Sequence, residues 1–180
     1  MEEENTNNIL AFLNKHNVPW MPINLEIVKT SKNKVKKILK PYNENNDMPS
    51  YKDLSNIDLV KKRQQWTDKY LNIWIDTKFI NQIDVDGDTD PQLNTPYFKS
   101  ISKNKKHYFI TGFHGFNKNR SPTKWKDVEL LSGQGSYATK SNIVYNSHLD
   151  ISDYSGNVHQ ILNPDNDTKP KKSQKVINKN

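Results

Sequence analysis

The residues best suited to chemistry lie between Phe79 and Asp90, in the run F-I-N-Q-I-D-V-D-G-D-T-D. Apolar Ile83 and Val85 alternate with Asp84 and Asp86, which is the period of a strand with one face on a core. The two carboxylates then leave the same face, roughly 6–7 Å apart. Like charges this close repel unless a cation lies between them, and a hard divalent ion such as Mg²⁺ suits carboxylate oxygens. The alternative interpretation is a solvated acidic turn.

Two further polar clusters lie on candidate strands later in the chain. His107 follows Lys105 and Lys106, and Asp127 lies two residues before Glu129. Two carboxylates from one strand and a third from another can hold two metal ions for phosphoryl transfer. A histidine beside lysines suits the triphosphate of an incoming nucleotide. Taken separately, a structural histidine and the solvent face of an edge strand would explain these clusters; together, and in this order, they favour a catalytic site.

Other phosphate and metal motifs fit the chain poorly. An EF-hand loop beginning at Asp84 would need Gly at its sixth and Glu at its twelfth position, where this chain has threonines. A restriction-type nuclease would need Glu-x-Lys, but Leu131 stands two residues after Glu129. The run Ser132–Ser136 matches neither a dinucleotide fingerprint nor a P-loop. The D-x-D pair of metal-dependent glycosyltransferases stays open on the dyad alone.

The elements that must position these residues follow from the hydrophobic pattern. Apolar residues on a helical period predict a helix over Asn5–His16 and another that begins at Ser55. Two prolines predict an extended segment over Val18–Asn24. Apolar runs predict strands at Asn72–Ile75, Phe79–Asp86, His107–Ile110, Trp125–Leu131 and near Asn142–Tyr145. Turn residues predict a connection at Pro91–Pro96 and a loop at Gly112–Thr123, and the run Ser132–Tyr137 separates the last two strands.

Composition bounds the class of protein. The 180 residues fit one domain or one slightly enlarged domain. The chain has no cysteine, which excludes disulfides and thiolate zinc sites. No apolar run approaches the roughly 20 residues that span a bilayer, and the start M-E-E-E-N lacks the layout of a signal peptide. We therefore expect a soluble intracellular, cytoplasmic protein without a membrane partner.

The charge balance favours a polyanionic partner. The formal net charge is +7, and a basic run extends over Lys29–Lys40. Such a run is usually a solvated face, and nucleic-acid contact is the alternative. Lysine enrichment alone would give the same net charge.

In the order of its clusters, the chain resembles the primase-polymerase domain of the archaeo-eukaryotic primase superfamily, in the version found at the N-terminus of primase-helicases of large DNA viruses. The likeness covers roughly Ile9 to Asn146. The residues that carry it are I-W-I-D-T (Ile73–Thr77), N-Q-I-D-V-D (Asn81–Asp86), T-P-Y-F-K-S (Thr95–Ser100), K-K-H-Y-F (Lys105–Phe109), D-V-E-L-L-S-G-Q-G-S-Y-A (Asp127–Ala138) and I-V-Y-N (Ile143–Asn146).

The resemblance implies an α/β (α+β) fold of the primase type over residues 1–163, a mostly antiparallel sheet flanked by helices. Residues 164–180 are then a disordered basic tail or a truncated linker. By resemblance, the catalytic and metal-binding residues are Asp84, Asp86 and Glu129, with Mg²⁺ or Mn²⁺ as the ion and Asp127 as the alternative third ligand. His107, with Lys105 and Lys106, would bind the nucleotide; the family usually has a small or Ser-Gly context where these lysines stand.

The implied function is template-directed primer synthesis in DNA replication, by a nucleotidyltransferase that uses nucleoside triphosphates and a single-stranded DNA template. A helicase in cis or in trans would be its partner, and a viral replication site in the host cell its location. The family's helicase portion is missing, so the chain is a fragment, a standalone catalytic domain or a decayed remnant. The rival interpretation is a catalytically inactive nucleic-acid-binding relic or accessory module of a replication protein.

Overall fold

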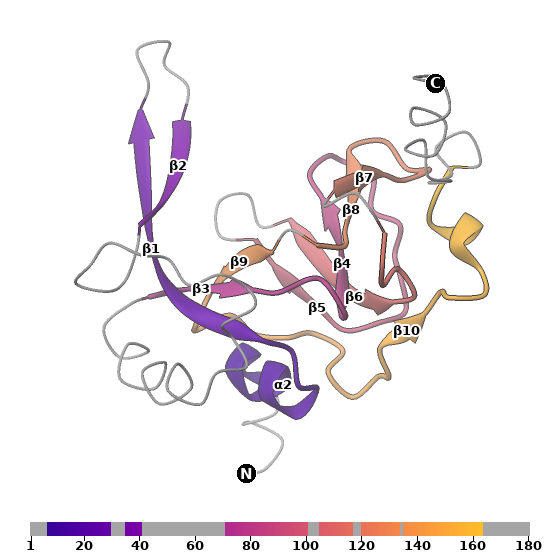
Figure 1. Ribbon diagram of the computed structural model, residues 1–180, viewed down its shortest axis with the longest axis horizontal. Coiled ribbons are helices and arrows are strands. Elements are labelled where there is room, and N and C mark those ends of the chain that lie inside the picture. Colours follow the sequence, from indigo (N-terminus) through magenta and orange to yellow (C-terminus); the bar gives the residue numbers. More distant parts are fainter. Residues whose placement is uncertain are drawn as a thin grey trace, which may run out of the picture. The chain divides into compact units, whose positions relative to one another are not determined.

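The computed structural model describes residues 7–29, 35–40, 71–100, 105–116, 120–133 and 135–163. The chain divides into two compact units, and each is described by itself. The first unit comprises Met1–Asp76 and Ser136–Val144, and the second comprises Thr77–Gly135 and Tyr145–Asn180. Figure 1 labels the elements of both.

The first unit contains the predicted N-terminal helix, which forms as α2 (Ile9–Lys15). Its cap is Asn8, whose side chain accepts a hydrogen bond of 2.9 Å from the amide of Leu10. This bond satisfies one of the donors that the first helical turn leaves unpaired. Three apolar residues on a helical period are buried, namely Ile9, Phe12 and Leu13.

The first unit also contains a four-stranded sheet in the order β2-β1-β3-β9, with every pair antiparallel. Its strands are β1 (Trp20–Lys29), β2 (Val35–Lys40), β3 (Asn72–Ile75) and β9 (Ser136–Thr139). The predictions of an extended segment at Val18–Asn24 and a strand at Asn72–Ile75 are confirmed. The sequence pattern predicts no strand at Ser136–Thr139, yet β9 forms there and completes its hydrogen bonds by pairing with β3.

The second unit is built on a sheet in the order β10-β6-β4-β8-β7, with β5 also paired to β6 (Figure 1). Its strands are β4 (Asn81–Val85), β5 (Tyr97–Lys99), β6 (Lys106–Thr111), β7 (Arg120–Pro122), β8 (Val128–Leu131) and β10 (Ser152–Asp153). All of these pairs are antiparallel except β10 with β6. The strand predicted around His107–Ile110 is confirmed, and the strand predicted at Phe79–Asp86 is confirmed within narrower bounds.

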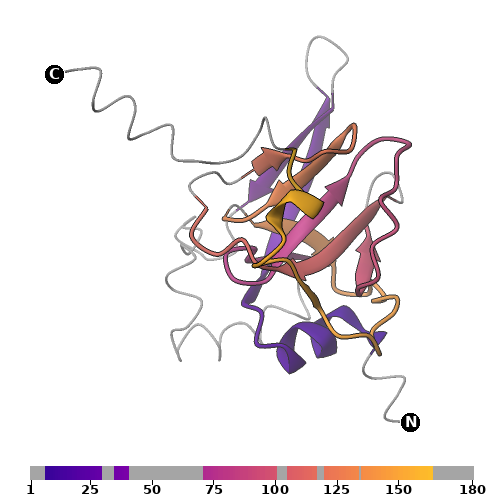
Figure 2. The same ribbon diagram turned by 90° about the vertical axis from the view of Figure 1, so that its right-hand side faces the viewer.

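One face of this second sheet forms the core of the unit. The central strand contributes Ile83 and Val85, which alternate with Asp84 as the sequence pattern predicted. The segment that ends the described chain, with the 3₁₀-helix η2 (Val158–Gln160, yellow in Figure 2), supplies Ile161 and Leu162 to the same core. Asp84 therefore lies on the face opposite this core.

Two strand predictions near the acids need correction. The strand predicted at Trp125–Leu131 begins only at Val128, because Trp125 to Asp127 form the turn of the β7–β8 hairpin and Asp127 has a left-handed φ of 56°. The strand predicted at Asn142–Tyr145 makes only isolated bridges at Ile143 and Tyr145. Neither bridge extends into a ladder, so no strand forms there.

At the coarse level, the prediction of a mixed α/β chain with mostly antiparallel sheets is confirmed. Within the described residues, helix is limited to α2 and η2. The helix predicted from Ser55 and the tail predicted over 164–180 lie outside the described residues. None of the described helices is long and apolar enough to cross a membrane.

Candidate active site

A row of polar side chains crosses three neighbouring strands of the second unit. In the register of the sheet, Asp84 of β4 lies directly opposite His107 of β6 on one side and Glu129 of β8 on the other. Directly paired residues in an antiparallel sheet point to the same face, with Cβ atoms about 4.5–5.5 Å apart. The register therefore brings together three of the residues that the sequence predicted for the site.

Asp84 is the centre of this row, and only 6% of its surface is exposed. Its Oδ1 lies 3.5 Å from Nε2 of His107, and its Oδ2 lies 3.4 Å from Nη1 of Arg120. A carboxylate this well buried needs such partners, because transfer of an unpaired charge out of water is costly. Asp84 is thus held between two basic groups.

His107 has a fixed orientation. Its ring stacks on Phe98, with centroids 4.8 Å apart and planes inclined by 9°. Its Nδ1 lies 3.2 Å from Oε1 of Gln82, so both ring nitrogens face side-chain oxygens. His107 is buried among these groups, and its ring can turn little without breaking one of them.

Arg120 is the site residue that the sequence analysis missed. Nη1 of Arg120 lies 3.1 Å from Oε1 of Glu129 as well as 3.4 Å from Asp84, so one guanidinium bridges the two acids. The sequence did not mark Arg120 as a site residue, because the run around it is rich in Gly, Asn, Ser and Pro and predicts a loop. The strand β7 emerges only through its pairing with β8.

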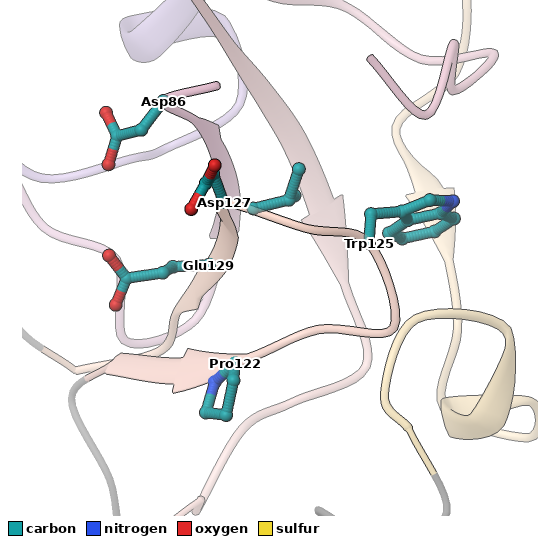
Figure 3. A pocket seen from close by; sticks show the side chains of 6 residues that line it. Asp86, Pro122, Trp125, Asp127 and Glu129 are labelled. Carbon is teal, nitrogen blue, oxygen red and sulfur yellow. The ribbon is translucent and has the colours of Figure 1, made fainter. Parts of the chain in front are cut away.

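The three remaining acids of the predicted site gather around a surface hollow of about 490 Å³, whose lining includes Asp86, Trp125, Asp127 and Glu129. Figure 3 shows the carboxylates of Asp86, Asp127 and Glu129 pointing to the same side, whereas the ring of Trp125 points the other way. The amide of Asp86 donates a hydrogen bond of 2.9 Å to the carbonyl of Asp127, which fixes the two backbones side by side.

The hairpin turn that carries Asp127 is closed by Thr123. Its amide and its hydroxyl both donate to the carbonyl of Val128, at 3.1 and 2.7 Å. A Cβ atom on Gly87 would lie only 2.7 Å from the Cβ of Asp127, so the absence of a side chain at position 87 permits this approach. On the other side of Gly87, Nζ of Lys105 donates to its carbonyl at 3.2 Å.

Lys106 is the predicted site residue that the structure does not bring to the acids. It precedes His107 in β6, so its side chain leaves the opposite face of the sheet. Nζ of Lys106 lies 2.7 Å from Oδ2 of Asp90 and 4.6 Å from the ring centroid of Tyr97. The hydroxyl of Tyr108 donates to the same Asp90 carboxylate.

This second cluster has its own electrostatics. Partial burial would raise the pKa of Asp90, but the hydrogen bonds from Lys106 and Tyr108 outweigh it and hold that pKa below its ordinary value. Burial raises the pKa of Tyr108, and the neighbouring Asp90 carboxylate raises it further. Lys106 and Tyr108 thus stabilise the ionised form of Asp90.

The donor types at the acids fit a divalent metal ion, because Mg²⁺ and Mn²⁺ prefer carboxylate oxygens. Asp84, Asp86 and Glu129 would hold it, with Asp127 as the alternative third ligand. As they stand, no three His, Asp or Glu side chains in the described part of the chain lie close enough together to form a metal site. Between Asp84 and Glu129, the positive charge is supplied by Arg120.

Comparisons of the chain with models of protein families, with curated proteins and with solved structures give no significant match.

Proposed function

We propose that the Thr77–Gly135 segment carries the active site of a primase-polymerase-type nucleotidyltransferase, which synthesises short primers on a single-stranded DNA template from nucleoside triphosphates. The observation that carries the proposal is the row His107–Asp84–Glu129 across β6, β4 and β8. Three strands far apart in sequence supply a histidine and two acids to one face, and a further acid, Asp86, follows on the same strand end.

The chain's own residues divide into two groups in this proposal. Asp84, Asp86 and Glu129 form the acidic side that would hold Mg²⁺ or Mn²⁺, which when bound supplies charge stabilisation for phosphoryl transfer. His107 lies beside Asp84, and Lys105, whose ammonium contacts the Gly87 carbonyl and the Asp88 carboxylate, would join it as the basic side that binds the nucleotide phosphates. Lys106 falls outside this division, because its ammonium is paired with Asp90 on the other face.

A primer-synthesis assay tests the proposal. The chain is incubated with single-stranded template, labelled nucleotides and Mn²⁺, and extension products are separated by length. Asp86→Asn keeps the size of an exposed side chain but removes its charge, so synthesis should fall by orders of magnitude while the fold survives. Asp150→Asn removes an equally exposed acid outside the site and should leave synthesis unchanged. Absence of synthesis by the parent chain, or equal synthesis by Asp86→Asn, would refute the proposal.

One observation favours the second candidate, a non-catalytic nucleic-acid-binding module. The Arg120 guanidinium already bridges Asp84 and Glu129 and offsets part of their charge, which lessens their repulsion without a metal ion. Isothermal titration with Mn²⁺ separates the two candidates. A catalytic domain binds Mn²⁺ and loses affinity on Asp86→Asn, whereas a module that no longer catalyses has no reason to bind it.

A further inference from the structure

Arg120 begins the edge strand β7 and contacts Asp84 and Glu129, although the sequence pattern did not predict it as a site residue. In the β7–β8 register, Arg120 pairs with Leu131 and Pro122 pairs with Glu129, so Arg120 and Glu129 are diagonal neighbours on one face. A long side chain crosses that distance readily, and Nη1 reaches one step further to Asp84. The contact therefore depends on side-chain reach rather than on the backbone of Arg120.

The two ends of the bridge differ in their exposure. Asp84 has 8% of its side chain exposed, whereas Arg120 has 41% and Glu129 has 38%. The buried carboxylate cannot move far, but the guanidinium can leave toward water by rotation about its own side-chain bonds.

Arg120 and a metal ion would compete for the same oxygens. A divalent ion binds carboxylate oxygens at about 2.0–2.6 Å, and a guanidinium within hydrogen-bonding distance of those oxygens would repel it. Building on the proposed function, we propose that Arg120 is a displaceable counter-ion of this site. It offsets part of the charge of Asp84 and Glu129, which the β4–β8 register places side by side, and a divalent cation must expel it in order to bind.

Because of this competition, the acids bind a divalent ion more weakly than they would without the Arg120 guanidinium. Removing the guanidinium removes two partly exposed ion pairs that the metal otherwise has to break. Each such pair changes an equilibrium by a small factor, so Arg120→Gln should bind Mn²⁺ about tenfold more tightly than the parent chain. A substitution inside a binding site usually weakens ligand binding, whereas Arg120→Gln should strengthen it.

Isothermal titration with Mn²⁺ on the whole chain tests the proposal, with Lys126→Gln as the matched control. Lys126 is an exposed cation on the same hairpin, so its loss reports the general effect of one positive charge. We expect about tenfold tighter binding for Arg120→Gln and less than about twofold for Lys126→Gln. Equal gains in the two variants, or no gain in Arg120→Gln, would overturn the role of Arg120 while leaving the metal site intact.

Arg120→Lys keeps the proposal testable if Arg120→Gln fails to fold, which thermal unfolding followed by circular dichroism would reveal. An ammonium is a point charge and lacks the planar fork that spans two carboxylates, so this variant should gain about two- to threefold in Mn²⁺ affinity. Unchanged affinity would overturn the proposal. Should none of the proteins bind Mn²⁺, the proposed function falls as well, because no metal site exists for Arg120 to occupy.

Discussion

Glu129 lies directly opposite Asp84 in the β4–β8 ladder, whereas Asp127 precedes the strand and has a left-handed backbone. Both acids line the same hollow, but only Glu129 is held at a fixed cross-strand distance from Asp84. Asp127 is placed instead by its backbone contact with Asp86. The two candidates for the third acid thus depend on different parts of the fold.

This difference predicts which of the two acids binds the metal ion. Glu129→Gln should lower Mn²⁺ affinity by about tenfold or more, because it removes an ionised ligand fixed beside Asp84. Asp127→Asn should lower it by only about twofold, through the loss of nearby negative charge. Isothermal titration of both variants measures the order. If Asp127→Asn has the larger effect, the third ligand is Asp127.

His107 predicts a stability cost that must be separated from its proposed role with the nucleotide. His107→Ala removes a buried ring from its stack on Phe98 and should destabilise the fold by about 2 kcal/mol. His107→Gln keeps a polar group there and should be more stable than His107→Ala. It should still raise the nucleotide concentration that gives half-maximal synthesis. Urea unfolding and nucleotide-dependent rates provide the two readouts.

Phe98→Leu is the control for His107, because it loosens the same stack and keeps the imidazole. It should lower stability while leaving the nucleotide dependence close to that of the parent. A shift in nucleotide dependence as large as that of His107→Gln would assign the effect to packing rather than to the imidazole.

The close approach of Gly87 to Asp127 predicts that a side chain at position 87 is not tolerated. In Gly87→Ala the new Cβ would lie 2.7 Å from the Cβ of Asp127, so the hairpin turn must shift. We expect a loss of about 1–2 kcal/mol in the free energy of unfolding, together with weaker Mn²⁺ binding. Gly156→Ala meets no atom within 4 Å and should change neither quantity. Equal stability of the two variants in urea unfolding would show that the turn yields without cost.

Asp90 predicts a pH-dependent contribution to stability. Its pKa in the folded protein lies below the ordinary value of 3.8, so the stabilisation is fully present above that value and is lost as the pH falls through the lowered pKa. Asp90→Asn should therefore cost roughly 1 kcal/mol at pH 7 and progressively less in acid below pH 3.8. Urea unfolding at several pH values measures the difference, and a cost that grows toward low pH would contradict this assignment.

The β1–β2 hairpin predicts salt-dependent binding to single-stranded DNA. Its strands include Lys29, Lys36, Lys37 and Lys40. If these lysines bind phosphates, the affinity should fall with salt on a log–log slope of about −0.7 for each phosphate neutralised. Replacing Lys36 and Lys37 with Gln should flatten the slope, whereas Lys15→Gln at the end of α2 should not. Fluorescence anisotropy over a salt series makes the comparison, and a salt-insensitive affinity would exclude an electrostatic mode.

The local elements of this chain were predictable because their signal is carried by neighbouring residues. The helix α2 follows from apolar residues on a helical period, and β3 and β6 follow from apolar runs between turn residues. The alternation around Asp84 also showed which side chains face the core and which face the acids. Each of these inferences needs only a few consecutive residues.

The pairing of strands was less predictable, since it depends on residues far apart in the chain. The strand β9 contains serine and follows glycines, so only its partner β3 stabilises it as a strand. Arg120 was missed for the same reason, because β7 is a short edge strand whose identity comes from β8. Alternation alone could not distinguish Asp127 from Glu129, and the left-handed turn at Asp127 decides which of them lies in the ladder.

The pairing of β3 with β9 has a consequence for which part of the chain carries the candidate chemistry. Ile75 and Ser136 are direct partners, so the 77–135 segment leaves and re-enters the first sheet at adjacent positions. All the acids, His107 and Arg120 lie within that one excursion. The candidate chemistry is therefore carried by one continuous segment, whereas the core beneath it also needs Ile161 and Leu162 from outside that segment.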